Sequence, residues 1–281
     1  MNIPKYWARG SQSVQDGKGR SMNCTCCGWS NESVADAERK AKDRAGVVAR
    51  KLFVQQQLNR YEYGDRPLRE QVVSSIASKT GKEVAVITRN AYGVLVVNAA
   101  ATMFIDIDFA GGPGLIARLK RLFGTPLPDP ERNALDAVAA WSAAHPAVGM
   151  RVYRTCAGMR CMVTTRQSEP TSVDSLAILS ELDSDPLYIR LCEKQGCYRA
   201  RLTPKPWRCG IGRPPAAFPW ENSAAEQAHH EWVERYEKAA APFSVCRLVS
   251  WLGPQEVDRD VAPVLEAHDR LARAGDRKQL A

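Results

Sequence analysis

The sequence predicts an α+β fold with a mixed or antiparallel central sheet and flanking helices. Three runs rich in β-branched residues follow one another at 83–88, 93–98 and 102–109, with only short breaks between them. Two further β runs occupy 149–165, about a turn at 157–158. Strands joined by such short breaks pair as hairpins, whereas a doubly wound parallel sheet needs a helix between successive strands.

Helix-forming segments supply the flanking layers. The longest, 33–58, places alanine, valine and leucine along one face and has Asn31 or Ser33 as its N-cap. A short helix is expected from Pro67 through Ile76, because proline suits the first helical turn. The other expected helices are 115–123, 131–144, 172–182, 186–193, 224–240 and 261–274. Extended segments are expected at 198–203 and 245–251, and irregular segments at 10–23 and 204–220.

The order of these elements suggests three regions in the 281-residue chain. An N-terminal strand and helix region occupies 1–80, and a candidate catalytic or nucleic-acid-binding α+β core occupies 81–215. A C-terminal helix-strand-helix covering occupies 216–281. This length suits one large domain or two modest ones.

Composition narrows the class of protein. With 44% hydrophobic and 25% charged residues the chain has the balance of an ordinary globular protein. Its longest apolar stretch, 84–109, is broken by polar and charged residues, so no membrane span is expected. The first ten residues lack a secretory apolar core, so the nine cysteines are expected as reduced thiols in the cytoplasm. The formal net charge, 39 − 31 = +8, permits nucleic acid or a nucleotide polyphosphate as partner.

Two carboxylates at the end of the third apolar run are the first candidate site. Side chains alternate along a strand, so Asp106 and Asp108 point to the same face. Neighbouring like charges repel unless a cation neutralises them, and hard oxygen ligands favour Mg²⁺ or Mn²⁺. The Gly-Gly-Pro-Gly segment 111–114 then offers an open loop where phosphate oxygens can approach backbone amides. The alternative is a strand end at which one aspartate caps a loop or pairs with an arginine.

The hairpin 149–166 is the second candidate. It carries Arg154, Thr155 and Arg160 among four cations and several hydroxyls. A guanidinium binds phosphate through two parallel hydrogen bonds, so this composition suits a phosphate site. The alternative is a set of ordinary surface arginines on an edge hairpin.

The third candidate is the segment 194–213, which contains six cations and no acid. Arg199 and Arg201 share one face of the expected strand, and a proline-framed loop follows. That loop carries Lys205, Trp207 and Arg208, which combine positive charge with stacking surface. The segment therefore predicts a nucleotide or single-strand binding wall, with a solvated basic loop as the alternative.

The order of these motifs over about 83–208 resembles the archaeo-eukaryotic primase (primase-polymerase) superfamily. The resemblance rests on a hydrophobic strand ending in Asp106-Ile-Asp108, a hairpin with Gly158-Met-Arg160 and a basic strand leading to Lys205. Members have an RRM-like catalytic core, a D-x-D strand that binds two metals and a Gly-x-His hairpin that contacts the incoming nucleotide. The chain also resembles uncharacterised bacterial proteins that carry YGDRPLRE and ARLTPKPWR segments, here 63–70 and 200–208.

The primase resemblance implies a role for each motif. It makes Asp106 and Asp108 ligands of Mg²⁺ or Mn²⁺, with a later acid, Asp183 or Asp185, completing the site; we assign Asp185. Arg160 stands in the place of the histidine that contacts phosphate. The arginines and lysine of 199–205 are then expected to line the triphosphate or template path.

These expectations lead to one main hypothesis and two rivals. The main one is a cytoplasmic, metal-dependent, primase-polymerase-like nucleotidyltransferase acting in DNA replication, with a nucleoside triphosphate and DNA or RNA as partners. The first rival is a non-catalytic nucleic-acid-binding accessory of replication or of a mobile element. The second is a D-x-D glycosyltransferase that binds a sugar nucleotide through manganese, although the sequence lacks a recognisable N-terminal nucleotide-binding βαβ unit.

Overall fold

The computed structural model describes residues 1–15, 17, 19–54, 66–109 and 129–281 and confirms the α+β fold. Its strands are β1 (Tyr6–Gln15), β2 (Ser21–Ser30), β3 (Gln71–Ala77), β4 (Glu83–Arg89), β5 (Leu95–Ala99), β6 (Phe104–Asp108), β7 (Met150–Thr155), β8 (Gly158–Val163), β9 (Tyr198–Arg201), β10 (Phe243–Ser244), β11 (Cys246–Leu252) and β12 (Gln279–Leu280). Its helices are α1 (Val34–Phe53), α3 (Pro130–Ala144), α4 (Val173–Glu181), α5 (Pro186–Gln195), the 3₁₀ turn η1 (Pro206–Cys209), α6 (Ser223–Ala240) and α7 (Ala262–Ala272).

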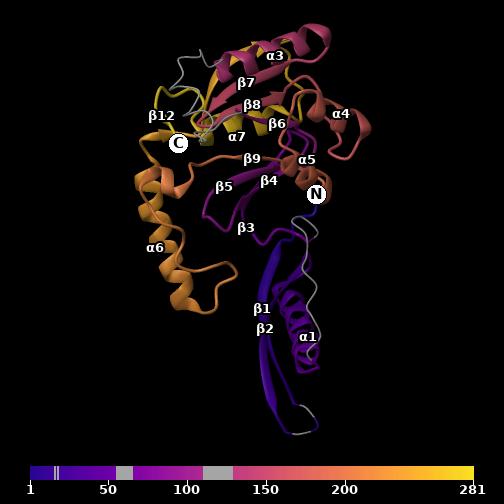
Figure 1. Cartoon of the computed structure of the whole chain (residues 1–281), viewed down its shortest axis with the longest axis vertical. Coiled ribbons are helices and arrows are strands. Elements are labelled where there is room, and N and C mark those ends of the chain that lie inside the picture. Colours follow the sequence, from indigo (N-terminus) through magenta and orange to yellow (C-terminus); the bar gives the residue numbers. More distant parts are fainter. Residues whose placement is uncertain (16, 18, 55–65, 110–128) are drawn as a thin grey trace, which may run out of the picture.

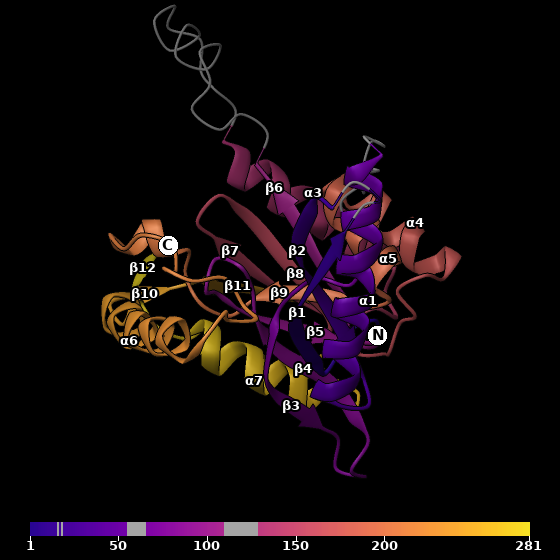
Figure 2. The same ribbon diagram turned by 90° about the horizontal axis from the view of Figure 1, so that it is seen from below.

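Two four-stranded antiparallel sheets form the body of the molecule (Figure 1). One has the order β3-β4-β5-β9 and the other the order β11-β7-β8-β6. Buried side chains of both sheets belong to one continuous hydrophobic core. The views from the side and from below agree that α6 lies on one side of the sheets and α4 and α5 on the other (Figures 1 and 2).

The edge strands β6 and β9 meet where the two sheets adjoin, and a tyrosine joins them. The Tyr188 hydroxyl donates to the carbonyl of Phe104 in β6 at 2.9 Å and accepts the amide of Arg199 in β9 at 3.3 Å. A side chain thus occupies a place where a continuous sheet would have backbone hydrogen bonds. The ladder partner of β9 is β5, and the two sheets diverge at this junction.

β1, β2 and α1 form an arm that extends beyond the sheets (Figure 1). β1 and β2 pair as a hairpin and α1 lies against one of its faces. The helix approaches closely because glycines face it: a Cβ on Gly28 would lie 2.3 Å from the Ala37 carbonyl oxygen. The helix begins at the predicted N-cap, where the Ser33 hydroxyl accepts the Asp36 amide at 3.1 Å.

Two expectations from the sequence are wrong. The helix expected from Pro67 through Ile76 is instead strand β3, which pairs with β4 along its length. The irregular segment expected at 10–23 belongs largely to β1 and β2, since pairing and the contact with α1 order these polar residues. Both errors arise because pairing with the next strand, and for the hairpin the packing of α1, decides the conformation, and local composition does not reveal this pairing.

The remaining expected elements are confirmed, with ends that differ by one or two residues. The exceptions are the helix expected at 115–123 and the end of the helix expected at 33–58, residues 55–58, which lie outside the described residues. The C-terminal region does more than cover the core, because β11 pairs with β7. The cysteines are all free thiols, as expected. Within the described residues, no helix is both long enough and apolar enough to span a membrane.

The close approach of α1 to the hairpin gives a first test. We expect Gly28→Ala to destabilise the arm by about 1–3 kcal/mol, because the added methyl overpacks a backbone contact. Gly46→Ala, in α1, is the matched control: its Cβ would meet Gln12 at an ordinary 3.4 Å, so it should gain up to about 1 kcal/mol from helix propensity. Urea unfolding followed by far-ultraviolet circular dichroism measures both, and equal effects would contradict the packing described.

Candidate active site

An open cavity of about 550 Å³ lies beside the junction of the two sheets. Its volume is in the range of sites that bind small molecules, about 300–1,000 Å³. The structure brings six of the eleven predicted site residues to its wall. These are Asp106, Arg160, Asp185, Arg199, Arg201 and Lys205.

Two carboxylates, Asp106 and Asp185, line the cavity. A third, Asp108, lies close enough to interact electrostatically with both, although it lines a second, smaller cavity. Asp185 is the N-cap of α5, where its side chain accepts the Leu187 amide at 3.0 Å, and its own amide donates to the Asp106 carbonyl at 3.2 Å. Asp108 lies at the exposed end of β6. Partial burial raises the pKa of Asp108, and the charges of Asp106 and Asp185 raise it further. Placing a cation there would relieve this repulsion.

The buried Arg160 forms an ion pair with Asp106. It is 1% exposed; its Nε donates to Asp106 Oδ1 at 3.1 Å and its Nη1 to the carbonyl of Arg201 at 3.0 Å. The same Nη1 lies 3.4 Å from His268 Nε2. Arg160 thus links β8 to both β6 and β9, and this geometry suits a residue that positions a carboxylate. The phosphate contact that the resemblance implies for Arg160 stays a prediction.

The tautomer of His268 follows from its neighbours. A guanidinium only donates hydrogen bonds, so the buried Nε2 of His268 must accept from Arg160. The proton is therefore on Nδ1, which donates to Asp269 Oδ1 at 2.9 Å. Burial lowers the pKa of His268, and the Arg160 charge lowers it further, against the opposing hydrogen bond to Asp269. A neutral imidazole thus continues the chain of polar contacts from Asp106 into α7.

Arg199 takes part in a second buried network. Its Nη2 donates to both carboxylate oxygens of Glu70, at 2.7 and 2.9 Å, and its Nη1 donates to Asn98. Thr88 donates to Glu70 and accepts from Asn98. Glu70 and Arg199 are both less than 10% exposed. Arg199 therefore forms part of the cavity wall through a satisfied ion pair that joins β9 to the segment before β3.

Two cations that crowd each other, Arg201 of β9 and Lys205 of the segment after it, also line the cavity. Burial lowers the pKa of Arg201, and the charges of Arg160 and Arg208 lower it further. Partial burial lowers the pKa of Lys205 too, together with the charges of Arg201 and Arg208. Each cation thus raises the cost of charging its neighbours. An anion bound among them would remove this cost.

An exposed aromatic pair stands beside these cations. Trp207 in η1 contacts Tyr92, in the turn between β4 and β5, edge to face at 5.5 Å between ring centroids. Trp207 is among the residues predicted for the site, whereas Tyr92, His268 and Arg213 are not singled out by the sequence. An aromatic residue at the tip of a short hairpin was the available signal for Tyr92, whereas only the fold brings His268 to Arg160.

Arg154 and Thr155, at the end of β7, lie away from this cavity. The Arg154 Nε donates to Glu131 of α3 at 2.7 Å, and its guanidinium lies 4.5 Å from the centroid of Phe109. These contacts use the guanidinium within the fold. The nucleotide-binding role expected for the two residues therefore has no support from their position.

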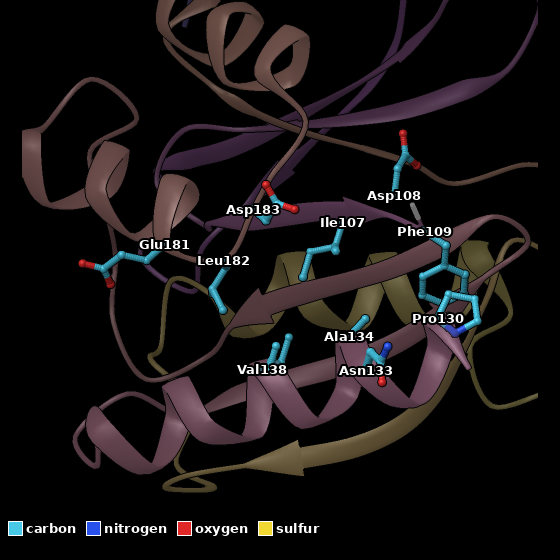
Figure 3. A pocket seen from close by; sticks show the side chains of 11 residues that line it. Ile107, Asp108, Phe109, Pro130, Asn133, Ala134, Val138, Glu181, Leu182 and Asp183 are labelled. Atoms are coloured by element: carbon cyan, nitrogen blue, oxygen red, sulfur yellow. The ribbon is translucent and has the colours of Figure 1, made fainter. Parts of the chain in front are cut away.

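A smaller cavity of about 340 Å³ lies on the other face of β6. Figure 3 shows Ile107 and Phe109 directed toward α3, with Asp108 pointing the other way. This confirms the alternation expected along 102–109. Of the two candidates for the third acid, Asp183 lines this smaller, mostly apolar cavity, whereas Asp185 lines the larger one.

The acids fit a metal that arrives with its substrate better than a preformed metal cage. Among the described residues no group of three histidine, cysteine or acidic side chains is close enough to hold a metal ion alone. Magnesium is usually held by one or two carboxylates together with substrate phosphates, and it keeps several waters. Asp106 and Asp108 on one face of β6, with Asp185 nearby, supply that kind of donor set.

Comparison of this chain with protein-family models, with curated proteins and with solved structures gives no match.

The Arg199 network leads to a stability test. We expect Arg199→Met to cost about 3–5 kcal/mol in the free energy of unfolding, because it leaves the Glu70 carboxylate buried and unpaired. The double variant Glu70→Leu/Arg199→Met removes both charges and should recover much of the loss. Arg132→Met, at an exposed ion pair with Asp136, should leave stability unchanged. Chemical denaturation gives all three values, and an unaltered Arg199→Met protein would exclude the network as a stabilising element.

His268 leads to a pH test. Its pKa is lowered in the folded state, so the unfolded chain binds the proton more readily below about pH 6.5. The contribution of His268 is therefore present above that pH and lost as pH falls, with a limiting slope of about 1.4 kcal/mol per pH unit. We expect His268→Gln, which keeps an acceptor for Arg160, to have a flatter profile between pH 7.5 and 5.5 in denaturant titrations. Parallel profiles would mean that His268 is not held neutral.

Proposed function

We propose that the protein is a primase-polymerase-like, metal-dependent nucleotidyltransferase that acts on a nucleoside triphosphate and a nucleic acid strand. One observation carries the proposal: a cavity large enough for a nucleotide is lined by carboxylates from β6 and α5 and by crowded cations from β9 and the segment after it. A divalent cation bound to a triphosphate presents both complementary charges at once. Neither nucleic acid nor phosphate alone would account for the acidic side.

The path of the chain also supports the proposal. Among the described residues from β6 to β9, the elements follow the order strand, helix, two strands, two helices, strand. The βαββαβ order that an RRM-like core requires is contained in this succession. In the structure β9 lies beside β6, joined to it by Tyr188, while its ladder hydrogen bonds go to β5. We interpret the core as an RRM-like unit whose last strand also closes the neighbouring sheet.

Each group has a role in the proposed reaction. The 3′-hydroxyl of a strand loses its proton to water, and its oxygen attacks the α-phosphorus of the nucleotide while the bond between that phosphorus and the pyrophosphate oxygen breaks. A divalent cation, held by Asp106, Asp108 and Asp185, would supply Lewis acidity at the phosphate oxygens. Arg201 and Lys205 bind the phosphates and neutralise the charge that develops on pyrophosphate. Arg160 positions the Asp106 carboxylate.

One contact favours the non-catalytic nucleic-acid-binding alternative. The Arg160 guanidinium already neutralises one oxygen of Asp106, which weakens the attraction of that carboxylate for a cation. A protein that uses only the basic wall would bind a strand with a steep dependence on salt and none on metal. Metal dependence therefore separates the two functions.

Calorimetric titration with Mn²⁺ and a non-hydrolysable nucleoside triphosphate is the test. We expect binding to the wild type that requires the metal and falls at least tenfold in Asp106→Asn/Asp108→Asn, because the metal loses two charged ligands. Asp174→Asn, at an exposed acid of α4, is the control and should bind like the wild type. Lys205→Met should weaken nucleotide binding as well.

Incorporation of labelled nucleotides on primed and unprimed templates then tests catalysis. The double aspartate variant should incorporate none, while Asp174→Asn remains active. Equal nucleotide binding by wild type and double variant would contradict the proposed function. Metal-independent strand binding without any incorporation would favour the accessory protein.

A further inference from the structure

The mouth of the cavity carries two large aromatic side chains that remain open to solvent. Tyr92 is 42% exposed and Trp207 48% exposed, and they contact each other edge to face. The Arg213 guanidinium lies 5.0 Å from the centroid of Tyr92, and the Lys205 ammonium 5.5 Å from that of Trp207. Aromatic surface interleaved with cations is the composition of sites that bind single-stranded nucleic acid.

The turn that carries Tyr92 is fixed from both sides. The Asn90 side chain accepts the amides of Tyr92 and Val94, at 3.0 and 3.1 Å. Gly93 has a φ of 80°, and a Cβ there would lie 2.3 Å from the ring of Trp232 in α6. The turn is therefore packed tightly onto α6, and the exposure of Tyr92 does not result from a loose loop.

The segment that carries Trp207 rests on the same helix. The hydroxyl of Tyr236 donates to the carbonyl of Pro204 at 2.5 Å, and the indole of Trp232 donates to that of Gly212 at 3.1 Å. The rings of Trp232 and Tyr236 stack at 5.0 Å with an interplanar angle of 8°. A buried aromatic pair on α6 thus supports an exposed pair above it. Ligand binding there would cost little ordering of side chains.

We propose that Tyr92 and Trp207 form a stacking platform for the unpaired bases of a single-stranded nucleic acid that runs toward the cavity. Arg208 and Arg213 lie in the same acid-free segment, 194–213, and supply positive charge for the phosphates of the strand. The direction of the strand rests on the proposed function, because the cavity is where its 3′ end would react. The platform itself depends only on the exposure of the two rings, the rigidity of the segments that carry them and the neighbouring charges.

A strand fits the platform better than a single nucleotide or a duplex. Tyr92 lines the cavity, whereas Trp207 lies outside its wall, so the aromatic surface continues beyond the space of one nucleotide. Bases of a duplex present only their edges, whereas unpaired bases offer the faces that stack on aromatic rings. The proposed ligand is therefore single-stranded and is bound with little preference for sequence.

Fluorescence anisotropy with labelled 20-nucleotide oligo-dT, on the full chain, tests the platform. We expect Trp207→Ala and Tyr92→Ala each to weaken binding by about 5- to 150-fold, the range for loss of one base–aromatic stack. Trp207→Phe keeps a ring and should recover most of the affinity. Val173→Ala, which trims an exposed side chain on α4, is the control, and circular dichroism checks that every variant is folded.

Three further measurements fix the identity of the ligand. Arg213→Met should reduce the slope of log affinity against log salt by about 0.7, as expected for one lost phosphate contact on a single strand. A duplex of equal length should compete poorly. Trp207→Ala should lower the affinity for the strand by a larger factor than the affinity for the metal–nucleotide complex measured by calorimetry.

The outcomes separate this inference from the proposed function. Loss of strand binding in the aromatic variants supports the platform even if no nucleotide binds, in which case only the proposed function fails. The platform is refuted if the wild type does not bind the oligonucleotide at low salt. That result would indicate a protein-docking surface instead. The platform is also refuted if the alanine variants bind the strand normally, or if Trp207→Ala weakens only nucleotide binding.

Discussion

One buried guanidinium fixes the geometry of the junction between the sheets. Arg160 is almost completely removed from water, and its hydrogen bonds reach Asp106 on one sheet, the carbonyl of Arg201 on the other, and His268 on α7. A buried charge is stable only where it is paired and hydrogen-bonded, so these partners must lie where they do. The positions of β6 and β9, and with them the two sides of the cavity, depend on this side chain.

The opening between the sheets follows from how the junction is made. Tyr188 and Arg160 satisfy backbone groups of β6 and β9 that would otherwise pair with each other. Side chains keep the strands adjacent without a ladder, so the sheets diverge and leave room beside the junction. Strand alternation then places Asp106 from one sheet and Arg201 from the other at the edge of the same space.

The sequence predicts local structure well because periodicity and capping are local. Alternation places Asp106 with Asp108 and Arg199 with Arg201, and the fold agrees. Alternation does not separate the roles of Arg199 and Arg201. Glu70, 129 residues from Arg199 in sequence, pairs with Arg199, whereas Arg201 lies among the crowded cations. Contacts with other elements overturn two further expectations. Pairing with β4 makes a strand of the segment expected as a helix at 67–76, and Glu131 binds Arg154, for which the sequence predicts a phosphate contact.

The two charged sides of the cavity do not neutralise each other. Asp108 and Lys205 influence each other electrostatically, yet burial and like charges shift the pKa of each against its charged form. A structure selected only for stability would place such opposite charges in direct contact. The partial burial of these groups among like charges costs stability in the free protein, and a ligand that brings the complementary charges would offset this cost. Functional sites are expected to contain local arrangements that lower the stability of the fold. These charged groups lie next to Tyr92, where the exposed aromatic surface begins. A single wall therefore continues from the charged cavity to the exposed rings.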